Sequence, residues 1–291
     1  MEKLVWLVIL LWTSVLADGC EAGGKSYSDQ QAAVDAAFAR VAQAVDRAPG
    51  LRPFLKVDHR RRGQKAGQSM PPATVGLFRA PELEIAAVRH NPKAAMEFPL
   101  RVLVYADPDG GVHMAYNSLD FVRSRHDLAG ALEGMAYKQI LKDLAEAAGI
   151  PAHATALPKD GTHGLIVNHA DGSVPEVAAR LRQAVEEVEG AVYFGEIDYQ
   201  AEAKEFGKDI PPVTLVVFGN PALGVPAMAD LPDLGLDQFP QKVVIWEDDD
   251  GVHTAHNDIG WQTDRRGGRR SLARARVRSG VGSTVRGAAN P

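Results

Sequence analysis

Histidine and aspartate are the residues of this chain with the clearest capacity for acid-base or metal chemistry. There are nine histidines, and His59 directly follows Asp58, so these two side chains can be considered as an acid-base pair. Zinc sites need three or four ligands that converge from rigid elements, and His59, His113 and His126 are the candidates in the first half. No HExxH or paired CxxC spacing accompanies them, so we predict no metal site and favour ordinary buried or surface histidines.

A Gly-Asn-Pro segment is the second candidate site. Gly219 and Gly224 allow a backbone to approach a ligand closely, and Asn220 offers both a donor and an acceptor. Pro221 and Pro226 would fix the shape of a loop. We expect this loop to hold a small ligand if it is functional; the alternative is that it only turns the chain at the end of a strand.

The usual catalytic patterns are missing from the sequence. There is no Gly-x-Ser-x-Gly nucleophile and no phosphate-binding loop, and the acidic turn at 247–251 lacks the spacing of a calcium loop. We therefore predict a non-catalytic module that binds a small ligand or an envelope protein, with no cofactor that the sequence identifies. Two alternatives stay open: an enzyme that uses Asp58 and His59 as acid and base, and a structural scaffold.

Charge limits the classes of partner. The net charge is -5 and the isoelectric point is about 6.0, which argues against a nucleic-acid binder because such proteins present a basic face to phosphates. Residues 265–291 differ, with eight arginines and no acidic residue. We find no apolar periodicity in this tail and predict that it is disordered. A change of reading frame, a basic tail for an anionic surface and an inert tail would each explain it.

The N-terminus has the features of a targeting segment. Lys3 precedes an uncharged apolar run, Leu4 to Ala17, which is shorter than the ~20 residues that cross a bilayer. We predict that residues 1–17 are a signal peptide and that the product is exported to the periplasm or cell envelope. Cys20, the only cysteine, lies just beyond this segment, so membrane attachment is expected only if Cys20 is lipidated.

The chain contains an internal duplication. A shift of 140 residues places Pro71-Pro72 on Pro211-Pro212, and a shift of 141 places FPLRVLVYAD (98–107) on FPQKVVIWED (239–248). Such ordered matches indicate two copies of one domain. We expect the copies to pair within the chain, so that the duplication would replace a homodimer.

The second copy shows the clearer element pattern. Ser173 and Glu176 form a capping box before an amphipathic helix, and Asn257 and Asp258 can cap a second helix. Strands are predicted at 164–170, 192–198, 214–218, 242–247 and 252–256. Each copy therefore has the order β-α-β4-α, an α+β fold with helices on an antiparallel sheet, although the leading strand of the first copy is not evident.

These patterns divide the chain into five parts. They are a signal peptide (1–17), a first domain (25–150), a linker (151–163), a second domain (164–264) and the basic tail (265–291).

Three stretches resemble one protein family. TLVVFGNPALGVPAM (214–228), FPQKVVIWEDDDG (239–251) and the AYN and RH within 115–126 are similar to the DUF302 family, a domain of unknown function. The resemblance implies a TATA-binding-protein-like β-α-β4-α fold in each copy, but no DNA binding.

Each copy departs from the family pattern at different positions. Copy one keeps Asp58-His59, where copy two has Asp198-Tyr199. It also keeps Arg125-His126, where copy two has Arg265-Arg266 and an atypical C-terminal end.

Overall fold

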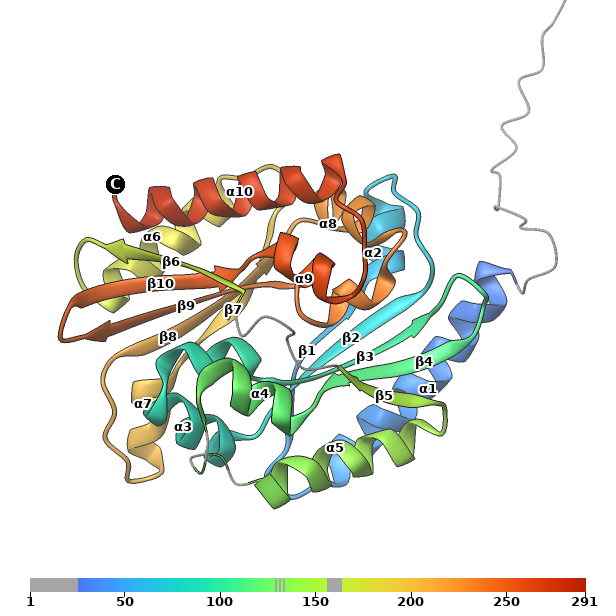
Figure 1. Cartoon of the computed structure of the whole chain (residues 1–291), viewed down its shortest axis with the longest axis horizontal. Helices are drawn as coiled ribbons and strands as arrows, with labels where there is room; N and C mark the ends of the chain where they lie inside the picture. Colours follow the sequence, from blue (N-terminus) through green and yellow to red (C-terminus); the bar gives the residue numbers. More distant parts are fainter. Residues whose placement is uncertain (1–25, 129, 131, 133, 156–163) are drawn as a thin grey trace, which may run out of the picture.

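The computed structural model contains one five-stranded sheet for each copy (Figure 1). It describes residues 26–128, 130, 132, 134–155 and 164–291, so the predicted signal peptide and Cys20 lie outside the described residues. The first sheet has the order β1-β2-β3-β4-β5 and the second β6-β10-β9-β8-β7.

The strands of the first sheet are β1 (Arg52–Asp58), β2 (Ala73–Arg79), β3 (Leu100–Ala106), β4 (Val112–Asn117) and β5 (Ala152–Thr155). Those of the second are β6 (Leu165–Ala170), β7 (Val192–Asp198), β8 (Val213–Gly219), β9 (Gln241–Asp248) and β10 (Gly251–Asn257). The helices of copy one are α1 (Tyr27–Arg47), α2 (His59–Lys65), α3 (Pro81–His90), η1 (Pro92–Glu97), α4 (Leu119–His126) and α5 (Gly134–Ala148). Those of copy two are α6 (Val174–Glu186), α7 (Tyr199–Glu205), α8 (Pro221–Met228), η2 (Pro232–Leu236), α9 (Ile259–Arg265) and α10 (Leu272–Ala289).

The predicted order of elements is confirmed in copy two, with short helices added between its strands. The capping box of Ser173 and Glu176 starts α6, and Asp258 caps α9 through the Gly260 amide. The short helices α2 and α7 directly follow β1 and β7 and were not predicted from the sequence.

The two copies complete their sheets differently at one edge. In copy two, β6 pairs antiparallel with β10, as a leading strand should. In copy one, that edge is covered by β5, which pairs parallel with β4 and places Ala152 beside Met114. The prediction of 151–163 as a linker is therefore wrong for its first part, because the open edge of β4 offers backbone partners that the chain uses as it leaves α5.

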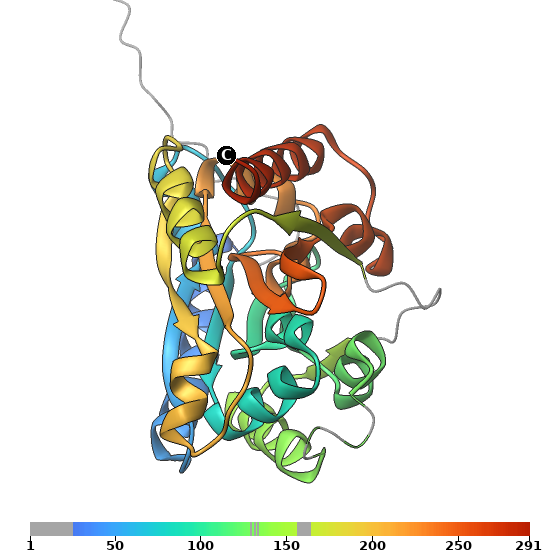
Figure 2. The ribbon, with the colours of Figure 1, turned by 90° about the vertical axis from the view of Figure 1, so that its left-hand side faces the viewer.

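The outer face of each sheet is covered by two helices of its own copy. Helices α1 and α5 bury Phe38, Val41 and Leu144 against the first sheet. Helices α6 and α10 bury Val177, Leu181 and Val285 against the second. Viewed from the side, α6 and α10 lie next to each other at one end of the molecule, and α5 lies at the other (Figure 2).

The predicted disorder of residues 265–291 is wrong. Ser271 caps α10 by accepting from the Arg274 amide, and Val277 and Val285 are buried on the side that faces α6 and α8. Val281 lies between them at a spacing of four, so the tail does carry an apolar stripe. The many arginines obscured it: Arg276, Arg278 and Arg286 lie on exposed faces of the helix, whereas Arg274 is buried beside the stripe.

The inner face of each sheet is covered by the other copy. Val75, Leu77 and Leu103 of the first sheet share a core with α8 and η2 of copy two. In return, α3 and η1 of copy one pack on the inner face of the second sheet, around Leu215 and Val244. Neither copy buries both faces of its sheet without the other.

Candidate functional site

Asp58 and His59, the pair predicted from the sequence, lie at the end of β1 and the start of α2. Their side chains have different surroundings. Asp58 caps α2, because its carboxylate accepts from the Arg61 amide at 2.8 Å, and it also accepts from the Arg61 guanidinium at 2.7 Å. His59 is 4% exposed and faces copy two: a Cβ atom on Gly235 would lie 3.2 Å from its Nε2. Among the described residues, no hydrogen bond joins the two side chains.

Burial keeps His59 neutral. Its Nε2 atom is buried without a hydrogen-bond partner in the described chain, and burial, helped by nearby Arg62, lowers the pKa of His59 to about 3. A neutral imidazole with this pKa does not suit a base that must take up a proton near neutral pH.

The predicted loop at 219–228 is a strand end followed by a helix. Gly219 closes β8, and Asn220 caps α8, with its Oδ1 accepting from the Ala222 amide at 3.1 Å. Its Nδ2 donates to the Glu189 carbonyl at 3.0 Å. The prediction of a loop is wrong because Asn at the cap and Pro at the first helical position start a helix, and the second proline does not stop it.

Helices α2 and α8 lie against each other although they come from different copies (Figure 1). The approach depends on Gly63, where a Cβ atom would lie 2.8 Å from Val225 of α8. This contact places six of the seven predicted binding residues around two neighbouring cavities. The smaller cavity is lined by His59, Gly219, Asn220, Pro221 and Gly224 among others, and Pro226 lines neither.

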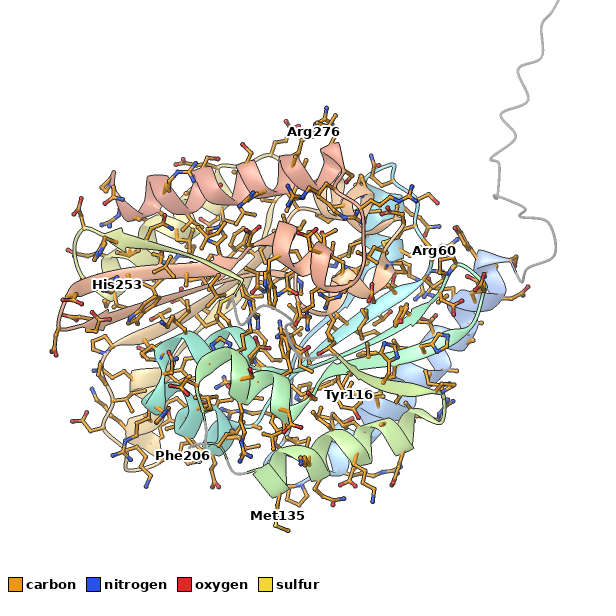
Figure 3. All side chains as sticks on the ribbon, viewed as in Figure 1. Arg60, Tyr116, Met135, Phe206, His253 and Arg276 are labelled. Carbon is orange, nitrogen blue, oxygen red and sulfur yellow. The ribbon has the colours of Figure 1, made fainter. Side chains whose placement is uncertain are left out.

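The larger cavity is an open cleft of about 510 Å³, which we call the α2–α8 cleft. It is lined by Lys56, Asp58, Arg61, Arg62, Lys65, Ala66, Gly190, Val192, Pro221 and Ala222. Arg61 is paired with Asp58 and Asp35, whereas Arg62 lies over the ring of Phe194 at 5.0 Å. Arg60 points to another side of α2, over the ring of Tyr27 (Figure 3).

The burial of His59 gives the first testable prediction. Its pKa in the folded protein, about 3, lies below the ~6.5 of an unfolded chain, so its contribution to stability is present above pH 6.5 and is lost as the pH falls. We expect wild type to lose about 2 kcal/mol more than His59→Leu between pH 7 and pH 5. Urea unfolding of both proteins at the two pH values measures this difference, and parallel losses would contradict it.

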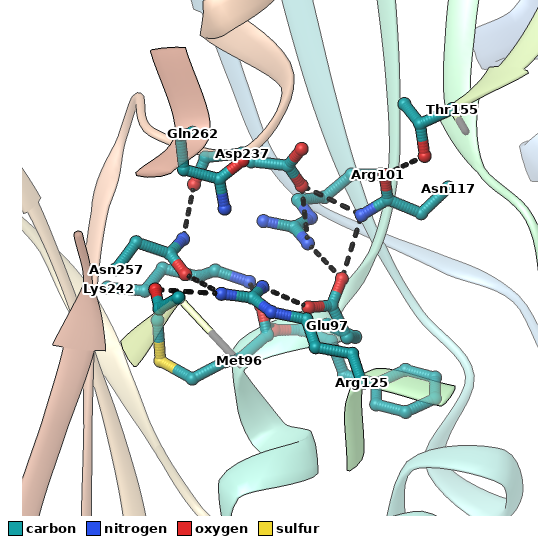
Figure 4. Close-up of polar contacts among 12 residues, drawn as sticks. Met96, Glu97, Arg101, Asn117, Arg125, Thr155, Asp237, Lys242, Asn257 and Gln262 are labelled. Carbon is teal, nitrogen blue, oxygen red and sulfur yellow. Dashed lines mark hydrogen bonds and ion pairs between the residues drawn. The ribbon is translucent and has the colours of Figure 1, made fainter. Parts of the chain in front are cut away.

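A second inter-copy feature lies at the centre of the molecule and was not predicted as a site (Figure 4). We call it the central polar cluster; it consists of Glu97, Arg101, Asn117, Arg125, His126, Asp237, Asn257, Gln262, Arg265 and Arg266. Copy one supplies the first five residues and copy two the last five. The sequence signal was available, because Asn117, Arg125 and His126 belong to the motif that carries the family resemblance.

Two carboxylates organise this cluster. Glu97 accepts from Arg125 at 2.6 Å and from Arg101 and Asn117 at 2.7 Å. Burial raises the pKa of Glu97, but Arg125 and Arg101 outweigh this effect and hold it well below its usual value.

Asp237, from copy two, is the second carboxylate that organises the cluster. It accepts from Asn117 at 2.7 Å, lies 3.0 Å from Arg101 and pairs with Arg265 and Arg266. These arginines lower its pKa although burial acts in the opposite direction, so both carboxylates are ionised.

The other histidines considered as metal ligands lie apart from one another. His126 Nε2 is 3.2 Å from Glu97, whereas His113 pairs with Asp107 at 2.7 Å near the far end of β4. His253, the equivalent of His113, pairs with Asp248 at 2.9 Å. Within the described ranges, no group of three or more His, Cys, Asp or Glu side chains can hold a metal ion.

Comparison with known proteins identifies the repeated unit. The family profile described as "Domain of unknown function DUF302" matches residues 27–148 and 166–278. A crystal structure titled "uncharacterized conserved protein DUF302 from Bacillus stearothermophilus" aligns with 43% of this chain and 95% of its own, at 12% identity and a TM-score of 0.36.

Curated proteins from Brucella also match part of the chain. "Fluoride-specific ion channel FluC 1" of Brucella suis biovar 1 (strain 1330) is 36% identical over 103 residues, which is 35% of this chain and 40% of that protein. The protein of the same name from Brucella abortus biovar 1 (strain 9-941) is also 36% identical over 103 residues, 35% of this chain and 37% of its own length. The chain thus spans about two fifths of these relatives. In the part of the chain that the structure describes, no helix is long and apolar enough to span a membrane.

Proposed function

Because the chain belongs to the DUF302 family in both of its halves, we propose that it is a non-catalytic binding module whose two copies together hold a small anionic ligand. The α2–α8 cleft is the proposed site. The observation that carries the proposal is the charge of this cleft, which four cationic side chains and one carboxylate line. Anions that carry carboxylate or phosphate groups are the chemistry that such a cleft favours.

A second cleft lies at the equivalent positions of the two copies, and its lining differs in charge from that of the α2–α8 cleft. It has a volume of about 730 Å³ and is lined by Gly50, Arg52, Pro81 and Phe206, at the positions of Gly190, Val192, Pro221 and Ala66. Its charged lining residues among those described are one arginine and one glutamate, Arg52 and Glu82. The fold therefore produces a cleft twice, and the basic lining occurs on the α2 side alone.

A titration with phosphate and citrate tests the proposal. We expect the double variant Arg62→Gln/Lys65→Gln to bind either probe about 10- to 100-fold more weakly, since hydrogen bonds to charged groups contribute ~1.5–3 kcal/mol. Arg60→Gln is the matched control, because Arg60 lies on the same helix but outside the cleft (Figure 3). Isothermal titration calorimetry at low salt measures the three proteins.

Fluoride is a third probe, because the Brucella relatives are named as fluoride-specific channels. Equal affinities in wild type and double variant would refute the cleft as the site. Absence of binding by all three probes would instead favour the scaffold, which the reciprocal covering of the two inner sheet faces supports independently.

The proposal includes export of the protein. The short apolar segment from Leu4 to Ala17 supports it, and Cys20 offers a point of lipid attachment. The intact mass of protein from the cell-envelope fraction tests this part, because a retained Met1 would contradict it.

A further inference from the structure

Several buried hydrogen-bond donors of the central polar cluster have no partner in the part of the chain that the structure describes. Arg101 uses only its Nη2 atom on Glu97 and Asp237, and its Nε and Nη1 atoms are buried without a hydrogen bond in the described chain. The same holds for Nε2 of Gln262, a fully buried residue of α9. Figure 4 shows the Gln262 amide and the Arg101 guanidinium turned toward the same space, one from each copy.

Arg265 adds further unpartnered donors. Its Nη2 atom binds Asp237 and Gln262, while Nε and Nη1 are buried without a hydrogen-bond partner among the described residues. The guanidinium lies over the ring of Phe121 at 4.3 Å.

The cluster also has more positive than negative charge. Counted over the described residues, four guanidinium groups, Arg101, Arg125, Arg265 and Arg266, stand against the carboxylates of Glu97 and Asp237. Asp233 at the rim lies 3.5 Å from Arg266 and reduces the excess to one. All four guanidinium side chains are at most 6% exposed.

Lys242 is a basic neighbour of this cluster. It is buried beside the cluster and donates to the backbone carbonyl of Phe98 at 3.1 Å. Burial and the charge of Arg101 lower the pKa of Lys242 well below its usual value. A buried, uncompensated charge is costly, so an anion at this place would stabilise the fold more than a water molecule can.

We propose that the central polar cluster binds one small monovalent inorganic anion, such as chloride or bromide, between Arg101 of copy one and Gln262 of copy two. Its ligands would be the free N–H groups of these two side chains, with Arg265 as a third donor. An anion there would accept from donors that have no other partner among the described residues. The site is separate from the α2–α8 cleft, with which it shares no residue.

Anion-dependent stability tests the proposal. The full chain is unfolded in urea, dialysed against HEPES and sodium gluconate, refolded, and titrated with chloride, bromide or sulfate at constant ionic strength. We expect chloride and bromide to raise Tm in a saturable way, by about 5 °C at 100-fold over the dissociation constant, and sulfate to have no saturable effect. Equal effects of all three salts would overturn the proposal.

Gln262→Glu is the decisive variant, because it places a carboxylate where the anion would bind. We expect it to melt at least as high as wild type without added anion and to lose the response to chloride. An unchanged chloride response in Gln262→Glu would overturn the proposal. Arg60→Gln, outside both the central polar cluster and the α2–α8 cleft, is the control and should keep the full response. Because the two sites share no residue, failure here and failure of the proposed function can be told apart.

Crystals of the wild-type chain grown in bromide provide a direct test that does not depend on any variant. An anomalous peak within hydrogen-bond distance of both Arg101 and Gln262 is expected. An ordered water at that place, with no anomalous signal, would overturn the proposal.

Discussion

Deletion of residues 271–291 is expected to lower the free energy of unfolding by about 5 kcal/mol. The deletion exposes the face of α6 that carries Leu181 and removes Val277 and Val285, and each fully buried aliphatic side chain contributes ~1.5–3 kcal/mol. It also removes Arg274, which donates to the Ala227 carbonyl at 3.0 Å and pairs with Asp230 at 2.6 Å. For a domain of this size the melting temperature should fall by about 10–20 °C.

Arg276→Gln in the full-length chain is the control for this deletion. Arg276 projects outward from α10 (Figure 3), and exposed substitutions of this kind change stability by less than ~0.5 kcal/mol. Calorimetry of the three proteins decides between a packed and a dispensable tail. A deletion variant that melts within 2 °C of wild type would show that α10 does not stabilise the fold.

Glu97→Gln is expected to destabilise the protein by about 3–5 kcal/mol, although it changes the side chain by one group. Glu97 is fully buried and compensates Arg125 and Arg101. Without its charge, Asp237 alone would face four buried guanidinium groups. Urea unfolding at pH 7 measures the loss.

Glu205→Gln, at an exposed position of α7, removes the same charge without affecting a buried pair. We expect it to unfold within ~0.5 kcal/mol of wild type. A loss equally small for Glu97→Gln would mean that the central polar cluster adds little to stability.

Most of the strands and the helix α6 could be predicted because their signals are local. Alternating and continuous apolar runs marked β7 to β10, and Ser173 with Glu176 marked the start of α6. The duplication strengthened these predictions, because the second copy served as a guide to the first. The fold class followed from the order of the elements.

The errors share one physical feature, which is that each element concerned is stabilised by packing against a distant segment. Strand β5 forms because the edge of β4 is open, and α10 is ordered because α6 and α8 cover its valine stripe. Asn220 and Pro221 start a helix that buries Val225 against copy one. No local pattern of the chain reveals these partners.

Only a part of the candidate sites could be predicted, because they too depend on contacts between distant segments. Asp58, His59 and the Gly-Asn-Pro segment were selected separately, and the structure places them on two helices in contact. The central polar cluster was missed because its two halves lie far apart in the chain, with 120 positions between Asn117 and Asp237 and 132 between Arg125 and Asn257. Their pairing follows from the way in which the two copies cover each other.

The covalent fusion of the copies frees the centre of the molecule from twofold symmetry. In a dimer of identical chains, every substitution occurs twice, so a second Glu97 would occupy the position that Gln238 has here. Here the equivalent positions hold Glu97 and Gln238, Arg101 and Lys242, and His126 and Arg266. One chain can thus hold a carboxylate in one copy and an amide at the equivalent position of the other copy. A central site that is formed unequally by the two copies, and that binds a single ligand, can then arise by mutation and selection.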